Sequence, residues 1–502
     1  MRPSLLLGVL VACLGIGVAP ATAAPRPPNV VFILADDLGY GDLGCYGQKI
    51  IRTPHLDRLA AEGMRFTQHY SGNAVCAPSR CVLMTGRHPG HAFIRDNRQF
   101  KPGEEGQFPI PADSVTLAKL FQQRGYATGG FGKWGLGGPG TTGEPLKQGF
   151  TRWYGYNCQA VAHNFYPTYL WDNDKQVPLN NPKFPAHDKF RDGEDPQDAK
   201  SYARFAGKEY AADLIAEQAR AFIRANKDRP FFCYVPTTVP HLALQVPDDS
   251  LGEYVGKFPD PPYAGGRGYL PHFKPRAAYA AMITRMDKEI GATMKLVADL
   301  GLDEHTIWVF TSDNGPLHGR HEGLAGTDAI FFNSSGGLRD GKGTLFEGGF
   351  RVPGIVRWKG KITPGQTSDR VTGFEDWVPT LMELTGASGA APKDSDGISF
   401  APTLLGQRQP ERAFLYREFP GYGGQQCVRM GDWKALGQNL KPAPGAKKAP
   451  APTLQLFNLR EDRAETTDVA AQHPDMVAKL TDLMRAQHTP SAEFPFPVLD
   501  QR

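Results

Sequence analysis

Residues 29–37 read NVVFILADD, a near-continuous apolar run followed by two aspartates. A run of this kind is expected for a strand that is buried on both faces of a parallel sheet. Residues 306–311 (TIWVFT) and 230–235 (PFFCYV) repeat the pattern. The first of these continues into Asp313-Asn314, and the second is followed by Pro240-His241. Because ligands of parallel sheets bind outside the carboxyl ends of the strands, these polar residues are expected to converge on one site.

Helical patterns between the strands, at 203–226 and 275–300, give an alternation of strand and helix. This alternation predicts an α/β fold with a large, mostly parallel sheet sandwiched by helices. Shorter strand patterns follow residue 386, at 413–417, 426–436 and 454–459. With a last helical pattern at 475–487, they predict a smaller C-terminal antiparallel sheet plus a helix. Residues 441–452 (KPAPGAKKAPAP) predict a solvated loop.

The first 24 residues are typical of a secretory signal peptide. Arg2 gives a positive start, residues 5–19 are apolar, and Ala21-Thr22-Ala23 is a small-residue cleavage site. Residues 10–13 (LVAC) also resemble a bacterial lipobox, but Cys13 lies early, so lipoprotein anchoring is the less favoured alternative. The prediction is a secreted or periplasmic protein with a large catalytic domain at 25–386 and a C-terminal subdomain at 387–502.

Composition argues against several classes of protein. The 502 residues carry a formal net charge of +4, and no basic run indicates nucleic-acid binding. No segment after the signal peptide is long and apolar enough to predict a transmembrane helix. The seven cysteines form neither a disulfide framework nor a zinc-binding pattern, although one bridge is compatible with an exported protein.

Two of the predicted strands end in side chains with oxygen donors: Asp36, Asp37, Asp313 and Asn314. Carboxylate and amide oxygens suit a hard divalent cation such as calcium or magnesium. Each pair also has an ordinary interpretation, because Asp-Asn-Gly is a strong turn signal and Asp-Asp-Leu-Gly is compatible with a simple strand exit. Either pair alone favours the turn, but both pairs at the ends of buried strands, in one chain with residues 76–80 (CAPSR), favour the metal site.

Residues 76–87 (CAPSRCVLMTGR) combine a cysteine with the start of a helix. Pro78 suits the first helical position, where its missing N–H costs nothing, and Arg80 and Leu83 follow at helical spacing. Cys76 would then lie at a helix N-terminus, where free N–H groups favour an anion or a developing oxyanion. The alternative is a buried structural cysteine, a common fate of this residue.

This stretch resembles the signature of the sulfatase family, C-x-P-S-R followed by x-x-L-x-T-G-R. The resemblance implies that Cys76 is oxidised after synthesis to Cα-formylglycine (3-oxoalanine), so that a formylglycine-generating enzyme is a partner. It further implies that Ca²⁺ is bound by residue 76 together with Asp36, Asp37, Asp313 and Asn314. Weaker likeness continues through residues 374–381 and 396–397, so the resemblance covers nearly the whole mature chain.

Residues 125–137 (GYATGGFGKWGLG) resemble the second family signature, G-Y-x-T-x-x-x-G-K-W-H-L-G. Lys133 is present, but Gly135 stands where the family usually has a histidine. In the family that histidine contacts the formylglycine hydroxyl and is a candidate base in the second half-reaction. Its role here is therefore dispensable or filled by another residue, for which the candidates are His88, His91, His163 and His321.

Two further matches add groups that would bind sulfate. His241 follows a predicted strand in Val239-Pro240-His241, where the family places a histidine that touches the sulfate ester. A solitary histidine is otherwise more often structural. Residues 341–349 (GKGTLFEGG) resemble the family's G-K-G-T-x-x-E-G-G, which makes Lys342 the second sulfate-binding lysine.

The resemblance implies hydrolysis of a sulfate monoester. Charge that builds on the sulfuryl oxygens would be stabilised by the metal and by Arg80, Lys133 and Lys342. The hydrated aldehyde at residue 76 would be the nucleophile, and His241 would protonate the leaving alcohol.

A loop rich in aromatic and amide side chains, residues 154–171, suits sugar rings, although these rings are equally compatible with packing of the loop itself. The substrate is expected to be a sulfated carbohydrate or an aryl sulfate, with contacts from Arg95, Asn97, His163 and Asn164.

The alternatives are a phosphonate or phosphate monoester hydrolase of the same superfamily and a non-catalytic binder of sulfated glycans. A cofactor-independent thiol hydrolase is the least favoured.

Overall fold

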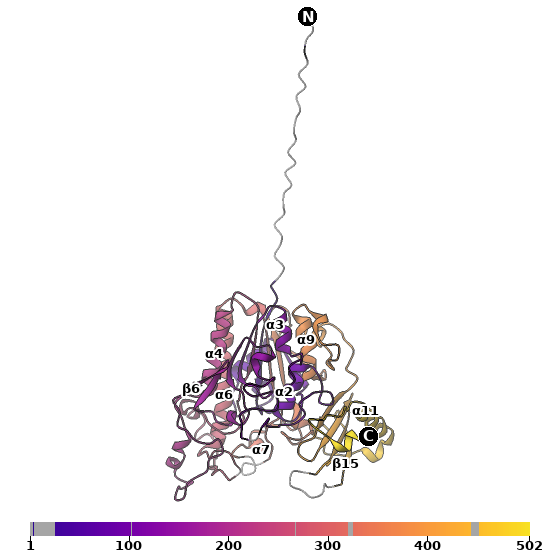
Figure 1. Ribbon diagram of the computed structural model, residues 1–502. Helices are drawn as coiled ribbons and strands as arrows, with labels where there is room; N and C mark the ends of the chain where they lie inside the picture. Colours follow the sequence, from indigo (N-terminus) through magenta and orange to yellow (C-terminus); the bar gives the residue numbers. More distant parts are fainter. Residues whose placement is uncertain are drawn as a thin grey trace.

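The structure is a computed structural model that describes residue 4 and residues 26–101, 103–266, 268–319, 325–442 and 451–501. Three expectations fall outside these residues: the signal peptide with Cys13 (all but residue 4), most of the loop at 441–452, and His321. Figure 1 shows the large sheet between two groups of helices, with the C-terminal part of the chain at one end.

Parallel strands form the centre of the large sheet, in the order β8 (Thr306–Ser312), β1 (Asn29–Ala35), β7 (Phe231–Pro236), β3 (Ala127–Lys133) and β4 (Arg152–Tyr156). Every residue of β1, β3 and β8 is buried. Burial on both faces explains why β1 is apolar at nearly every position. The predicted mostly parallel α/β sheet is confirmed.

Further strands extend both edges of the sheet in mixed directions. Beside β8 lie the antiparallel β9 (Arg351–Trp358), then β2 (Met64–Tyr70), with which β10 (Gln366–Ser368) and β11 (Thr372–Gly373) pair. Beyond β4 the sheet continues antiparallel through β5 (Tyr169–Asp172) and β6 (Lys175–Pro178).

Helices cover both faces of the sheet (Figure 1). One face packs against α1 (Pro54–Ala61), α4 (Ala211–Ala225) and α6 (Pro275–Asp299). The other packs against α2 (Cys76–Thr85), α3 (Leu117–Gln123) and α9 (Trp377–Leu384). Short helices lie in the connections: α5 (Asp248–Leu251), α7 (Ala329–Phe332), α8 (Glu347–Phe350), α10 (Ala401–Leu404) and α12 (Pro497–Asp500).

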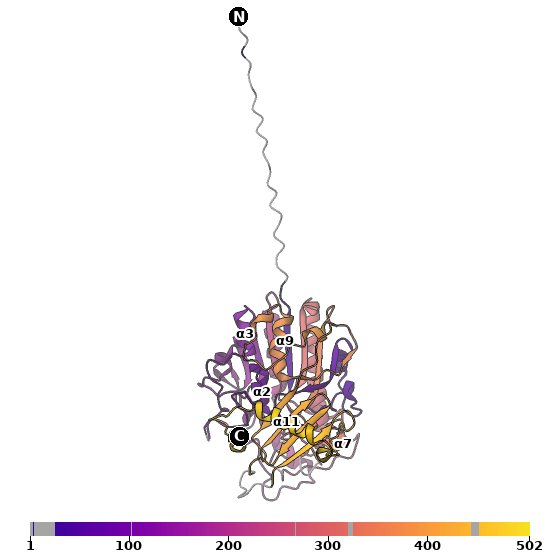
Figure 2. The same cartoon turned by 90° about the vertical axis from the view of Figure 1, so that its right-hand side faces the viewer.

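The C-terminal region forms the predicted second sheet, which is four-stranded and antiparallel. Its strands, in order, are β12 (Leu415–Phe419), β13 (Gln425–Met430), β14 (Trp433–Gln438) and β15 (Thr453–Asn458). Helix α11 (Pro474–Ala486) packs on this sheet, which Figure 2 turns toward the viewer.

Three element predictions differ from the structure. The strand expected at 426–436 is a hairpin, because Gly431 at φ +57° opens a turn between β13 and β14. The helix expected at 203–226 is interrupted by extended residues near Gly207, and α4 begins only at residue 211. Pro78 is the third residue of α2, so that Cys76 itself takes the first helical position.

Among the described residues, no helix has the length and apolar character needed to cross a membrane. The six cysteines that the structure describes are all free thiols, and five of them are buried.

Candidate active site

The carboxyl ends of β1 and β8 bring the two acidic pairs together. These strands pair in parallel register up to Ala35 and Ser312, so Asp36 and Asp313 leave the sheet side by side. The backbone N–H of Asp313 donates to the Ala35 carbonyl (3.0 Å), and that of Asp36 donates to the Val239 carbonyl (3.1 Å). The segment after β7 is thereby joined to the same edge, as the sequence predicts.

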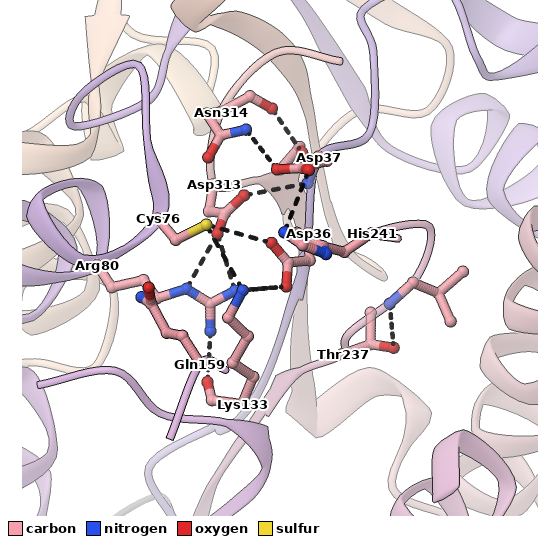
Figure 3. Close-up of polar contacts among 12 residues, drawn as sticks. Asp36, Asp37, Cys76, Arg80, Lys133, Gln159, Thr237, His241, Asp313 and Asn314 are labelled. Carbon is pink, nitrogen blue, oxygen red and sulfur yellow. Dashed lines mark hydrogen bonds and ion pairs between the residues drawn. The ribbon is translucent and has the colours of Figure 1, made fainter. Parts of the chain in front are cut away.

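The second residue of each pair completes an oxygen-rich cluster (Figure 3). Asp37 has a left-handed backbone (φ +64°), a conformation that aspartate tolerates better than most residues. Its carboxylate accepts a hydrogen bond from Asn314 Nδ2 (2.8 Å), and its N–H donates to Asp313 Oδ1 (3.2 Å). Asn314 Oδ1 is buried and has no hydrogen-bond partner within the described part of the chain.

Cys76 opens α2 and points into this cluster. Its Sγ lies 3.6 Å from Asp36 Oδ1 and 3.5 Å from Lys133 Nζ. The next backbone N–H, of Ala77, is held by Asn97 Oδ1 (3.0 Å). Burial raises the pKa of the Cys76 thiol to about 12, so the unmodified side chain is protonated at neutral pH.

Two buried cations neutralise the first acidic residue of each strand end. Lys133, the last residue of β3, places Nζ 2.7 Å from Asp36 Oδ2. Arg80, one turn along α2, donates from Nε (3.0 Å) and Nη2 (2.8 Å) to Asp313 Oδ2. Although burial opposes ionisation of Asp36, Lys133, His241 and Arg80 hold its pKa well below the usual range. Burial, together with the charge of Asp36, raises the pKa of Asp313 to about 6.

Lys342 and His241 face Asp37. Lys342 Nζ lies 2.7 Å from Asp37 Oδ1, and this carboxylate raises the pKa of the lysine despite its burial. His241 Nδ1 lies 2.6 Å from the Leu242 carbonyl, so this nitrogen carries the proton of the neutral ring. The other nitrogen, Nε2, faces the cluster, 3.5 Å from Asp37 Oδ2. Burial and the two lysines lower the pKa of His241 well below its ordinary value.

The cluster fits a hard divalent cation. Side-chain atoms of Asp36, Asp37, Cys76 and His241 lie within 4.8 Å of one another. The unpartnered Asn314 Oδ1 adds a neutral oxygen donor to the buried carboxylates. Oxygen donors of this kind are the ligands that calcium and magnesium prefer.

The candidate histidines for the role vacated at Gly135 lie in different places. His88 and His91 stack on each other (4.2 Å between ring centroids) and pair with Asp396 and Gln487. His163 stacks almost parallel on His241, at 4.6 Å between ring centroids and 9° between ring planes. Of the three candidates that the structure describes, His163 is therefore the one in contact with the cluster.

The other predicted substrate residues make hydrogen bonds or ion pairs within the protein. Arg95 is buried and pairs with Glu418 of β12 (2.8 Å), whereas the exposed Asn97 lies beside Cys76 and accepts from the Ala77 N–H. Asn164 Oδ1 accepts from the Tyr166 N–H (2.9 Å). Most rings of the 154–171 loop belong to the core, including Tyr154, Tyr156, Phe165 and Tyr166. This burial favours packing of the loop over contact of those rings with sugar.

Two neighbours of the cluster were not anticipated from the sequence. Gln159 is 5% exposed, and its Nε2 lies 2.7 Å from the position that a Cβ on residue 135 would take. Tyr269 packs its ring against His163 (5.4 Å) and His241 (6.1 Å). Glycine at position 135 indicates that the space taken by the family's histidine side chain is available to another residue. No pattern in the sequence indicates which residue occupies it.

Comparison with known proteins identifies the family. The family model "Sulfatase" matches residues 28–387, and the model "N-sulphoglucosamine sulphohydrolase, C-terminal" matches 337–488. The chain belongs to the sulfatase family. It is similar to human (Homo sapiens) arylsulfatase A, with 36% identity over 84% of this chain and 76% of that protein. An N-acetylgalactosamine-6-O-sulfatase of Bacteroides thetaiotaomicron is 29% identical over 92% of this chain and 94% of that protein.

Solved structures agree with this assignment. The sulfatase superposes on Ps i-CgsB in complex with k-i-k-neocarrahexaose with a TM-score of 0.71 and 26% identity, over 92% of each chain. A phosphonate monoester hydrolase of Agrobacterium radiobacter shares the fold, with a TM-score of 0.61, 19% identity and coverage of 92% of this chain and 96% of that one. The protein is thus a sulfuric ester hydrolase, which acts on sulfate monoesters.

Proposed function

We propose that this sulfatase releases sulfate from a sulfated glycan outside the cytoplasm, using a formylglycine made from Cys76 and a bound Ca²⁺ ion. The observation that carries the proposal is the position of Cys76. Its Sγ lies between Asp36 and Lys133, at the edge where the acidic strand ends meet (Figure 3). A nucleophile there has a metal site on one side and buried cations on the other.

The ion would be held by Asp36, Asp37, Asp313 and Asn314. When bound, Ca²⁺ would stabilise negative charge on the sulfuryl oxygens and lower the pKa of a neighbouring hydroxyl. Formylglycine would supply, in its hydrated form, that hydroxyl as the nucleophile. The first turn of α2 orients residue 76 and favours negative charge beside it.

The cations of the site would bind the sulfate group. Lys133 and Lys342 each carry a flexible ammonium that can donate to a sulfuryl oxygen as well as to an aspartate. Arg80 is held in place by two hydrogen bonds to Asp313, so it would act mainly as a fixed positive charge.

His241 would protonate the leaving alcohol. Because Nδ1–H is committed to the Leu242 carbonyl, Nε2 is the atom that takes up and releases the catalytic proton. A bound sulfate anion would offset the charge of Lys133 and Lys342, which lower the pKa of His241 in the free enzyme. Binding of substrate would therefore favour the acid form of His241.

A glycan is the favoured substrate because of what surrounds the leaving-group side of the site. The rings of His163 and Tyr269 pack around His241 and offer apolar faces with polar edges. Among the relatives, one is an N-acetylgalactosamine-6-O-sulfatase and another is solved with k-i-k-neocarrahexaose.

The first test combines mass spectrometry with assays on two leaving groups. The peptide that contains Cys76, from a host with the modifying enzyme, should carry an aldehyde in place of the thiol. The enzyme should hydrolyse an aryl sulfate faster than the matching aryl phosphonate ester, and Cys76→Ala should abolish both activities. Undiminished activity of Cys76→Ala would exclude the formylglycine mechanism, and faster phosphonate hydrolysis would reassign the reaction.

The second test concerns the substrate. Sulfated glycan fragments and their chemically desulfated counterparts would be incubated with the enzyme, and free sulfate would be measured. Release from one class of sulfated fragment supports the proposal. Hydrolysis of aryl sulfates alone, with no sulfate released from any fragment, contradicts it. Binding of fragments without turnover identifies a carbohydrate-binding protein instead.

A further inference from the structure

We propose that Gln159 is a substrate-binding residue of this sulfatase: its carboxamide occupies the space that Gly135 leaves open and donates a hydrogen bond from Nε2 to the sulfate group. This inference rests on the proposed function of the site. It names a group that binds and orients the sulfate, in addition to the two lysines.

The backbone at Gly135 is fixed and crowded. Arg80 Nη1 donates to the Lys133 carbonyl, and the Trp134 N–H donates to the Tyr156 carbonyl (3.0 Å). Gly135 itself adopts φ +100°, a conformation that side chains with a Cβ rarely adopt. A Cβ built there would lie 2.7 Å from Gln159 Nε2, a distance that real Cβ atoms essentially never show, so the end of the Gln159 side chain would have to move away. Gln159 therefore fills the space into which a residue 135 side chain would point.

The carboxamide of Gln159 is buried, and its Nε2 donor has no hydrogen-bond acceptor in the described part of the chain. Its backbone N–H is held by Gln107 Oε1 (2.8 Å), which fixes the loop. The side chain is 5% exposed, and Nε2 has no hydrogen-bond partner among the described residues. Buried polar groups are nearly always paired, so this unpaired donor indicates an acceptor that is absent from the protein itself.

The surroundings indicate that the acceptor is an anion. Figure 3 places Gln159 on the side of the cluster where Arg80 and Lys133 enter, and Lys133 contacts Cys76 Sγ (3.5 Å). A sulfate held by the lysine offers oxygen acceptors on that side. Because a carboxamide does not take up a proton near neutral pH, Gln159 cannot act as a base. Its contribution is binding and orientation of the sulfate.

The experiment compares Gln159→Leu with the wild type on an aryl sulfate. Removing one donor from a preorganised anion site typically costs about 10²-fold in rate, so kcat/KM is expected to fall about 100-fold. Inorganic sulfate should also inhibit the variant more weakly. Gln426→Leu is the matched control: Gln426 is a buried glutamine of β13 whose Nε2 already donates to Tyr416 and to the Met484 carbonyl, so the variant should keep the wild-type kcat/KM.

Gln159→Glu separates a sulfate contact from a purely structural role. An ionised carboxylate repels the sulfate, whereas a protonated one can donate a hydrogen bond again. The ratio of variant to wild-type kcat/KM should therefore rise as the pH is lowered. A ratio that does not change with pH, in a variant with the wild-type melting temperature, contradicts the proposal.

A double-mutant cycle tests the contact with Gly135. Gly135→Ala should lower kcat/KM much less in the Gln159→Ala background than in the wild type, because the clash with Nε2 is gone. Equal costs in the two backgrounds overturn the inferred contact. Each outcome is distinct from failure of the proposed function, in which the wild type itself would release no sulfate from any glycan fragment.

Discussion

Gly135 is the position where this sequence departs from its family signature. The structure shows that the backbone and Gln159 both disfavour a histidine side chain at this position. A side chain there would need a left-handed backbone and would meet Gln159 at 2.7 Å. We expect Gly135→His to lower both the melting temperature and kcat. The free energy of unfolding should fall by about 1–2 kcal/mol because of the backbone conformation, and kcat should fall because the Gln159 carboxamide is displaced.

Gly140 offers the matched control for that variant. It also has a positive φ (+75°), but no atom lies within 4 Å of its would-be Cβ. Gly140→His should therefore show the cost of the backbone conformation alone, with kcat unchanged. An activity gain in Gly135→His would show instead that the wild-type site is impaired by the glycine.

The proton assigned to His241 Nε2 can be tested with leaving groups of different quality. Protonation helps a poor leaving group, such as a sugar alcohol, much more than 4-nitrophenolate. His241→Gln should therefore lower kcat by about 10²–10⁴-fold on a sugar or alkyl sulfate and far less on 4-nitrophenyl sulfate. Equal losses on both substrates would assign His241 to binding and not to acid catalysis.

Metal binding can be read from stability without any assay of activity. A cation that binds only the folded protein stabilises it by about 2.7 kcal/mol at 100 times its Kd. Adding Ca²⁺ to the chelator-treated protein should raise the melting temperature, and Asn314→Leu should remove most of that increase. Asn226→Leu, a buried asparagine at the end of α4, should keep it. No thermal shift in the wild type would contradict the metal site.

At the scale of single elements, strand β2 carries a titratable group in the core. His69 is fully buried; its Nδ1 lies 2.8 Å from Thr372 Oγ1, and its Nε2 accepts from Trp377 Nε1 (3.4 Å). Burial lowers its pKa from 6.5 to about 3. Between about pH 6.5 and 3, His69 is therefore protonated in the unfolded chain but neutral in the folded chain.

The free energy of unfolding should consequently fall as the pH drops from about 6.5 toward 3, by up to about 1.4 kcal/mol per pH unit for this group. His69→Gln is expected to be less stable than the wild type at pH 7 but to lose less stability on acidification. Melting temperatures between pH 7.5 and 4.5 would show this difference. Parallel curves for the two proteins would contradict it.

The sequence predicts elements well where the pattern is local and burial is complete. Strand β1 is predicted to the residue, because an apolar run between turn residues has one interpretation. The hairpin of β13 and β14 is harder to predict, since its turn at Gly431 lies within a stretch whose mixed apolar and polar residues continue on both sides. The same holds for the candidate site. Cys76, Lys133 and their motif partners can be predicted from local sequence motifs. Gln159 and Tyr269 lie in loops whose position depends on tertiary packing, so the sequence does not indicate them.

At the scale of the whole molecule, the C-terminal sheet supports the active site through buried ion pairs. Lys434 of β14 lies between Glu347 (3.0 Å) and Glu465 (2.8 Å), and none of the three side chains is exposed. Glu347 belongs to residues 341–349, the segment that also contains Lys342. Lys434→Met removes the cation that pairs with the buried Glu465, whereas Glu347 still pairs with Arg351 (3.1 Å). The free energy of unfolding should therefore fall by about 3–5 kcal/mol.

Urea unfolding of Lys434→Met and Lys295→Met would test this junction. Lys295 is exposed, and within the described part of the chain its ion pair is with Asp299 on the same helix, so its loss should cost about 0–1 kcal/mol. If the two variants lose the same stability, the buried junction does not hold the C-terminal sheet to the large one.

The parallel pairing of β1 with β8 also sets the order in which this enzyme can be assembled. Asp37 and Asn314, which share a hydrogen bond, are 277 residues apart in the chain. During synthesis, the first strand is made long before the neighbour that completes its acidic end. A chain that stops short of β8 can therefore contain Cys76 and Lys133, but it lacks Lys342, Asp313 and Asn314 and cannot enclose a cation. The ability to retain Ca²⁺ would thus mark chains whose folding is complete.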